Sequence, residues 1–263
     1  YYQTVDRLFT NEVIQNITSP FAGKITVNSG SADKNVNYGG TAQVDLQFHP
    51  DHYTIVGLNY LVDSLNTEKN SYQTPPPSFA PQLSASVDDA TIYTVSAFAQ
   101  NEWSLNQDWK FTTGARYYYT KSTHDLALSG TSGMPGPVIL GPAGTKPDAS
   151  DGKLVTSAGL TYTGIENTTL RALYSEGYIT PTLVQMFMKT TAGGVSLNGN
   201  PDLDPETSRS FELGARYNAG GLILDSTAFY TQAKNYITTA PCPTPPSAAC
   251  PARQQTYINA DQA

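Results

Sequence analysis

The chain has 263 residues and a net charge of −7, with 15 Lys and Arg against 22 Asp and Glu. This balance argues against nucleic-acid binding, because no basic surface is available to neutralise a phosphate backbone. Charged residues make up 14% of the chain, below the roughly 25% of average soluble domains, and Tyr alone contributes 17 residues. No run of about 18 apolar residues predicts a transmembrane helix, but a barrel of alternating strands needs no such run.

Four short turn-like segments divide the chain, and each is flanked on both sides by about ten residues of alternating pattern. They are residues 49–52, 106–109, 164–167 and 218–221. Between them lie long stretches rich in Gly, Pro, Ser and Thr, at about 66–90, 122–151, 182–206 and 237–256. Short and long connections are therefore predicted to alternate along the chain.

The segments beside the short turns have one apolar and one polar face. In residues 41–48 apolar side chains alternate with Gln and Asp. In residues 91–105 the odd positions are mainly apolar and the even positions polar, apart from Phe98. Residues 109–120 and 207–217 alternate in the same way. Each segment is therefore predicted to be a strand with two chemically different faces.

Two architectures explain this alternation: a soluble sandwich, as in an adhesin or other binding module, or an outer-membrane barrel whose apolar face meets lipid. Strands of about 9–14 residues favour the barrel, because soluble strands are typically shorter. The alternating turn lengths suit the two rims of a barrel. Aromatic residues also gather near strand ends, at Tyr53, Trp103, Trp109, Tyr162 and Tyr217. We therefore predict an all-β, antiparallel transmembrane β-barrel, with about ten strands in this chain.

Several motifs carry a resemblance to a known family. Residues 199–208, Gly-Asn-Pro-Asp-Leu-Asp-Pro-Glu-Thr-Ser, resemble the GNPxLxPETS signature of TonB-dependent outer-membrane receptors. Residues 174–183 resemble the YSxGFRAPTL segment of that family, with Tyr-Ile-Thr-Pro in place of Phe-Arg-Ala-Pro. Residues 98–103 are similar to FxQxEW, residues 114–117 to GxRYD, and residues 257–263 to YxNxxxA, all in the family's order.

The resemblance implies a barrel of about 22 strands with an N-terminal plug domain, importing a scarce nutrient with energy passed on by TonB. Residues 1–263 would form part of the C-terminal β-barrel domain, with the plug domain and the final strands outside this chain. The expected location is the outer membrane of a Gram-negative bacterium, in contact with its lipid. The signature residues are Tyr174, Gly177, Pro181, Asn200, Pro201, Leu203, Pro205, Glu206 and Thr207.

The chemistry of the signature itself is modest. Pro201 and Pro205 remove two backbone donors and hold the approach to the next strand extended, and Asn200 suits a turn. Alternate carboxylates in residues 202–206 suggest a Ca²⁺ loop, but the rest of the EF-hand spacing is missing. A solvated junction between loop and strand is the preferred interpretation, and no metal site is predicted.

Cys242 and Cys250 lie close together in a long loop that strand counting places outside the cell. In an oxidising compartment such a pair is expected to form a local disulfide that stiffens the loop. The alternative, a thiolate metal site, lacks neighbouring His or further Cys residues.

The identity of the cargo depends on His and Met residues. His124 opens a long loop and could ligate haem iron. Haem receptors of the family typically place a ligating His between the two signature segments, where this sequence has Met186 and Met188. A thioether can ligate haem, but a flexible apolar contact is its commoner role. The expected cargo is therefore a ferric siderophore, with haem or another metal complex as the alternative, and no resident cofactor is expected.

A siderophore vestibule needs aromatic and cationic side chains. Suitable loop residues are Tyr72, Phe79, Tyr178, Phe187, Lys69, Lys121, Lys146 and Lys189. For any one of them, packing of loop against loop is the plainer interpretation. The predicted ligand contacts are Tyr72, His124, Tyr178, Met186, Phe187 and Met188. No Ser/His/Asp arrangement or carboxylate pair is recognisable, so we predict a transporter without catalytic residues rather than an enzyme such as an outer-membrane hydrolase.

Overall fold

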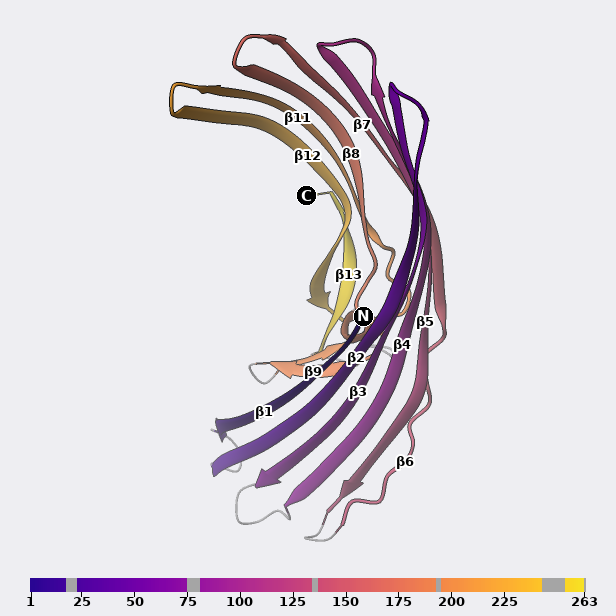
Figure 1. Ribbon diagram of the computed structural model, residues 1–263. Coiled ribbons are helices and arrows are strands. Elements are labelled where there is room, and N and C mark those ends of the chain that lie inside the picture. Colours follow the sequence, from indigo (N-terminus) through magenta and orange to yellow (C-terminus); the bar gives the residue numbers. More distant parts are fainter. Residues whose placement is uncertain (18–22, 75–80, 134–136, 193–194, 243–253, 263) are drawn as a thin grey trace.

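The computed structural model describes residues 1–17, 23–74, 81–133, 137–192, 195–242 and 254–262. They form one curved, open sheet (Figure 1). Its ten long strands are β1 (Tyr2–Ile17), β2 (Gly23–His49), β3 (His52–Thr74), β4 (Gln82–Ser104), β5 (Trp109–Ser132), β7 (Ala149–Ile165), β8 (Thr168–Ile179), β11 (Glu206–Ala219), β12 (Leu222–Pro241) and β13 (Gln255–Gln262). Each pairs antiparallel with the next, which confirms the all-β class and the predicted strand number.

Three short strands and one helical turn complete the described elements: β6 (Gly141–Pro142), β9 (Lys189–Ala192), β10 (Val195–Asn198) and α1 (Leu183–Met186). β10 pairs in parallel with β13 and antiparallel with β9, so the segment between β8 and β11 is joined to the sheet beyond β13. None of the helices in the described residues is long and apolar enough to cross a membrane.

The four predicted short turns are confirmed, between β2 and β3, β4 and β5, β7 and β8, and β11 and β12. All four lie at the same end of the sheet, at the top of the view in Figure 1. The connections at the opposite end contain more residues, and parts of them lie outside the described residues. The sheet therefore has the two unequal rims that the sequence predicts.

Seven of the ten long strands are longer than the predicted 9–14 residues, whereas β8 and β11 have the predicted length and β13 is shorter, and the predicted loop boundaries are wrong. β2 has 27 residues and β3 has 23, and most of the predicted 66–90 loop belongs to β3 and β4. The ladder between them runs from His52 opposite Trp103 to Gln73 opposite Gln82. Each added pair gains backbone hydrogen bonds, which outweigh the weak strand propensity of Ser, Asn and Asp. The stretch 182–206 is likewise not a plain loop, because it contains α1, β9 and β10.

One face of the sheet is convex and exposes the apolar side chains. On β4 and β5 these include Tyr93, Val95, Tyr117 and Tyr119, which lie at odd positions as the sequence predicts. The soluble sandwich required these faces to be buried against each other, and a single sheet with an exposed apolar face contradicts it.

Phe98 is the exception that the sequence pattern identified, and it lies on the concave, polar face. The guanidinium of Arg116 stands over its ring at 4.5 Å from the centroid. Gly57 lies opposite Phe98 on β3, where any Cβ would meet the ring. A cation–π contact and a missing side chain therefore accommodate an aromatic residue on this face.

Aromatic residues mark two levels on the convex face. Near the short turns, Trp109 packs against Tyr162 with ring centroids 4.5 Å apart. Tyr119 lies ten positions further along β5, and Trp103 and Tyr93 stand equally far apart on β4. Ten strand residues span about 33 Å, or about 23 Å across a membrane at a tilt of about 45°. The two levels therefore bracket a band of the height expected for an outer-membrane barrel.

Candidate functional site

The segment between β8 and β11 folds back onto the concave face of the sheet. It begins with α1, whose N-cap residue Thr182 accepts a hydrogen bond from the backbone N–H of Gln185 at 3.3 Å. Gln185 makes the second hydrogen bond of the pair: its Oε1 accepts the backbone N–H of Thr182 at 2.9 Å. This reciprocal capping box fixes the start of a helix that is too short to be stable by itself.

Apolar packing holds this segment against the sheet. Leu183, Met186, Phe187 and Met188 are all at least 97% buried, on the concave side of β3 and β4. Their partners in the cluster are Leu65, Ala90 and Ile92. Three of the predicted ligand contacts therefore lie in the interior of the described structure, with their surfaces against protein.

His124 joins the same cluster from β5. Its ring stacks on Phe187 with centroids 5.3 Å apart, and its side chain is 3% exposed. Nδ1 accepts the backbone N–H of Lys146 at 3.0 Å, so this nitrogen carries no proton and the proton of the neutral ring is on Nε2. Nε2 points to Asp88 Oδ1 at 3.4 Å. That distance is long for a hydrogen bond, which leaves Nε2 without a close partner.

Two lysines hold the segment through its backbone carbonyls. The ammonium of Lys146 donates to the carbonyl of Gly199 at 2.6 Å and to that of Met186 at 3.5 Å. Lys69, on β3 beyond the tyrosine level, donates to the carbonyl of Lys189. Burial lowers the pKa of Lys146 to about 8 and also lowers the pKa of Lys69, and the carboxylate of Asp88 opposes both shifts. Positive charge is therefore concentrated here and only partly neutralised.

Tyr178 lies beside this cluster. Its hydroxyl donates to Asp151 Oδ1 at 2.8 Å, and its ring stacks on Tyr118 at 5.3 Å. A hollow of about 330 Å³ opens next to it, lined by both Asp151 and Met186. Tyr72 lies elsewhere, on the opposite face of the sheet near the end of β3. The structure thus brings five of the six predicted ligand contacts into one region and leaves Tyr72 apart.

The GNPxLxPETS and YxNxxxA motifs bind each other. Asn200 Nδ2 donates to the carbonyl of Tyr257 at 3.1 Å, and Asn200 Oδ1 accepts the backbone N–H of Asp202 at 3.0 Å, which forms the predicted turn. Asn259 Oδ1 accepts the N–H of Asp204 at 2.9 Å, and Asn259 Nδ2 donates to the carbonyl of Asp204 at 2.8 Å. Two stretches that look unrelated in sequence therefore form one joint.

Other signature residues complete this joint. Glu206 Oε1 accepts the backbone N–H of Ile237 at 2.7 Å, where the pairing of β11 with β12 has ended. Gly177 leaves room for the hydroxyl of Ser208, and the ring of Tyr174 packs on Phe211 at 5.0 Å. Leu203 is buried. The signature is therefore a structural connection from loop to strand, as its chemistry predicts, and Thr207 enters the β11 ladder opposite Tyr178.

Within the described ranges, no three His, Cys, Asp or Glu side chains come together in a way that could hold a metal ion. The predicted Cys242–Cys250 disulfide stays a prediction, because Cys250 lies outside the described residues, as does Phe79. The backbone N–H of Cys242 donates to the carbonyl of Gln254 at 2.9 Å.

The contacts of Lys146 and Lys69 with backbone carbonyls were not predictable from the sequence. A lysine that binds a carbonyl leaves no pattern of complementary charge, unlike an ion pair at a fixed spacing. The contact between Asn259 and Asp204 was only weakly indicated by the sequence: both residues lie in motifs that contain an Asn suited to a turn.

Comparison with known proteins supports this architecture. All residues, 1–263, match the family model described as "TonB dependent receptor-like, beta-barrel". Over 149 residues the chain is 32% identical to the "iron-regulated outer membrane virulence protein" of two Vibrio cholerae serotype O1 strains. That alignment covers 56% of this chain and 19% of the relative, so the chain spans about a fifth of the length of the curated relatives it matches.

Solved structures share the fold at low sequence identity. The copper transporter OprC has a TM-score of 0.63 and 13% identity, covering 99% of this chain and 39% of that chain. The ferric yersiniabactin uptake receptor FyuA from Yersinia pestis has a TM-score of 0.54 and 18% identity, covering 89% and 33%. Because the family model covers the whole chain and the sheet has the matching form, the chain belongs to the TonB-dependent receptor β-barrel family of the Gram-negative outer membrane.

Proposed function

We propose that this chain is part of the barrel of a receptor that imports a ferric siderophore, with TonB acting through a plug domain outside residues 1–263. The curated relative is named as iron-regulated, which supports an iron complex as cargo. In this proposal the iron complex is a transported substrate, and the protein holds no resident cofactor. Transport rather than catalysis is the activity of the family.

The observation that carries the choice of cargo is the charge on the concave face beyond the membrane band. Lys69 lies close enough to Lys146 to lower the pKa of Lys146, and Lys189 lowers the pKa of Lys69 in the same way. Against these three lysines stand two carboxylates: Asp88 raises the pKa of both Lys69 and Lys146, and Asp33 raises that of Lys69. The local balance is therefore positive, and it would attract an anionic complex to the mouth of the barrel.

The surroundings of His124 favour a siderophore over haem. Its Nδ1 is used by the backbone of Lys146, and its Nε2 points to Asp88 in a buried position. The thioethers of Met186 and Met188 are buried in the same cluster. An axial haem ligand needs an accessible imidazole nitrogen or sulfur, and these buried residues would have to leave the cluster to provide one.

Uptake of radioactive iron by cells that make the full-length receptor tests this proposal. We expect TonB-dependent uptake from an anionic ferric siderophore, and Lys69→Gln with Lys146→Gln should weaken the apparent affinity by about tenfold. Lys110→Gln is the matched control, because Lys110 pairs with Glu102 at 2.7 Å near the short turns, far from this mouth. Heat-modifiable electrophoretic mobility would show that each variant is folded.

Growth on different iron sources separates the candidates. Growth on haem, together with no growth on any siderophore, would overturn the siderophore and establish the haem alternative. Equal loss of uptake in Lys110→Gln and in the double variant would show that local charge has no part in capture.

A further inference from the structure

The ladder between β7 and β8 stops before either strand ends. Its last pair toward the mouth of the barrel is Ser157 opposite Ser175. Beyond that pair, among the described strands, β7 pairs with β5 alone and β8 pairs with β11 alone. A side chain bridges the two strands where they part, because Oε2 of Glu176 accepts the backbone N–H of Thr156 at 2.9 Å. The wall of the barrel therefore divides at this point.

The hollow of about 330 Å³ beside Tyr178 lies where the two strands have parted. It is lined by the first residues of β7 and by residues that follow β8. Thr120 and Ser122 of β5 also line it, and they alternate with Tyr119 of the convex face, so they point into the lumen. Asp151 stands opposite Thr120 in the ladder of β5 with β7. The hollow therefore opens on the luminal side, just beyond the tyrosine level.

The hollow is strongly acidic. Four carboxylates line it, and none of its described lining residues is Lys, Arg or His; the four are Asp148, Asp151, Asp202 and Asp204. Lys121 lies 3.4 Å from the carboxylate of Asp148, and both side chains are about half exposed. The carboxylates of Asp202 and Asp204 have no partner among the described residues. This side of the mouth is therefore negative, whereas the lysines on the tall wall are positive.

A buried hydroxyl group in the hollow is an independent sign of a ligand. Ser122 is 5% exposed, and its hydroxyl has no hydrogen-bond partner among the described residues. A buried polar group without a partner costs stability unless a ligand or water satisfies it. Hydroxyl and carboxylate oxygens accept hydrogen bonds, and an ammonium group only donates them. Because the described carboxylates do not gather closely enough to hold a metal ion, an organic ammonium group fits the hollow better.

The acidity of the hollow is not needed for the joint of the signature. Asp202 and Asp204 occupy the two positions that the GNPxLxPETS motif leaves open. The joint uses only their backbone groups, which bind Asn200 and Asn259. Their side chains are exposed on either side of the buried Leu203. Both carboxylates are therefore free to bind a ligand.

We propose that this hollow binds a cationic arm of the cargo, an ammonium group attached to an otherwise anionic ferric siderophore. The inference rests on the proposed function and specifies its substrate class. Met186 lines the hollow, and its backbone carbonyl lies 3.5 Å from the ammonium of Lys146, so one segment separates the negative hollow from the positive cluster. A complex with negative charge alone would be attracted to the tall wall and repelled by the hollow. A siderophore with both charges suits the two sides.

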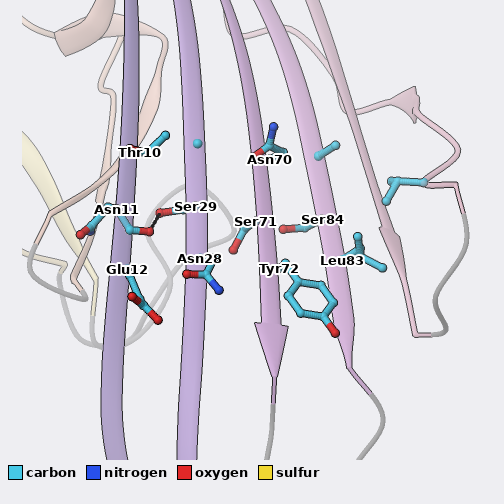
Figure 2. Close-up of a pocket in the computed structure, with 13 residues that line it drawn as sticks. Thr10, Asn11, Glu12, Asn28, Ser29, Asn70, Ser71, Tyr72, Leu83 and Ser84 are labelled. Carbon is cyan, nitrogen blue, oxygen red and sulfur yellow. Dashed lines mark hydrogen bonds between the residues drawn. The ribbon is translucent and has the colours of Figure 1, made fainter.

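A larger hollow provides the control. It has a volume of about 570 Å³ and lies near the ends of β1, β2, β3 and β4 (Figure 2). Its lining includes apolar Leu83, Ala85 and Val138, and Glu12 is the one acidic residue among the described residues that line it. Removing the carboxylate of Glu12 therefore changes the charge of the tall wall without altering the acidic hollow.

Binding to the purified full-length receptor tests this inference. The probes are two anionic ferric chelates, one of the tris-catecholate and one of the carboxylate type, each with a free aminoalkyl arm or with that arm N-acetylated. Retention of radioactive iron measures their affinity. We expect the free amine to bind about tenfold more tightly than its acetylated form. Asp202→Asn with Asp204→Asn should abolish this preference, and Glu12→Gln should keep it.

Ser122→Ala is a second variant, because it leaves the joint untouched and should reduce the preference about threefold. Heat-modifiable mobility shows that each variant is folded. Equal affinity of the wild-type receptor for the amine and acetylated forms would overturn the inference and leave the proposed function standing. A preference that survives both Ser122→Ala and the double variant in folded receptor would also overturn it. If neither chelate binds in any form, the proposed function fails, and the inference fails with it.

Discussion

The two halves of the sheet differ in height. In the tall wall, β2, β3, β4 and β5 have 23 to 27 residues, whereas β7, β8 and β11, the short wall, have 12 to 17. β4 continues eleven positions beyond Tyr93, but β8 ends five positions beyond Tyr174. The tall wall therefore stands clear of the membrane, and the segment that leaves the short wall folds back onto it.

The two walls are stabilised in different ways. The tall wall is an uninterrupted ladder, and its extension presents one surface to the lumen and another to the outer leaflet. The short wall stops at prolines, with Pro181 after β8 and Pro205 before β11, and its strand ends are tied by side chains instead. The β5–β7 ladder joins the two walls, and contacts of the segment between β8 and β11 with the tall wall add a second connection.

The largest effect is expected from weakening the contact between the tall wall and the segment that connects β8 to β11. Phe187→Ala removes a ring that is 2% exposed between His124 and the cluster on β3 and β4, which should destabilise the segment by about 3 kcal/mol. Hydrogen exchange should then speed up at the amides of Phe187 and Gly199, which now bond within the segment.

Phe48→Ala is the matched control, because Phe48 is 79% exposed at the short-turn rim. Its exchange pattern in the segment should equal that of the wild type. Unchanged protection of Phe187→Ala would show that the segment is held mainly by its lysine contacts and not by apolar packing.

The joint of the short wall should give the next largest effect. Asn259→Ala removes three hydrogen bonds of 2.8 to 2.9 Å, two with Asp204 and one with the carbonyl of Asn235. A loss of about 2 kcal/mol is expected, because the backbone groups of Asp204 and Asn235 lose their partner. The urea midpoint of the full-length receptor measures it, and Gln43→Ala, which removes only an exposed contact with Asp45, should leave that midpoint in place. Equal midpoints for the two variants would contradict the role of the joint.

A smaller, pH-dependent effect is expected at Lys146, in the connection between the two walls. Its pKa is lowered from 10.5 to about 8 by burial, against the attraction of Asp88 and with the repulsion of Lys69. Between these values the unfolded chain binds one more proton than the folded chain, so the free energy of unfolding should rise with pH through this window.

The measurement is the urea midpoint of the wild type and of Lys146→Met across that window. The urea midpoint of the wild type should rise relative to that of Lys146→Met as pH rises from about 8 to 10.5. A difference that stays constant with pH would mean that the ammonium is as well solvated in the folded receptor as in the unfolded chain.

The sequence predicted the strands, the short turns and the two faces, because alternation is repeated over many residues and pairing reinforces it. It did not predict how far the tall wall extends, since Ser, Asn and Asp resemble loop residues outside a ladder. Prolines were the better guide: β3 ends directly before Pro75, and β4 begins directly after Pro81.

The buried positions of His124 and Phe187 were beyond sequence reasoning for a different reason. They depend on a contact between β5 and a segment about sixty residues away, and alternation says nothing about which loop folds onto which face. Phe98 was recognisable as an exception, but its partners Arg116 and Gly57 follow from the strand register.

The smallest effect is expected at an ion pair on the concave face of the short wall. Arg171 Nη2 lies 3.2 Å from Asp225 Oδ1, and Gly214 between them leaves room for the guanidinium. Both side chains are more than 40% exposed, so Asp225→Asn should change the free energy of unfolding by less than about 0.5 kcal/mol. A loss above about 1 kcal/mol in the full-length receptor would mean that something shields this pair from water. The short wall would then depend on charge as well as on its joint, unlike the tall wall, whose height depends on an unbroken ladder.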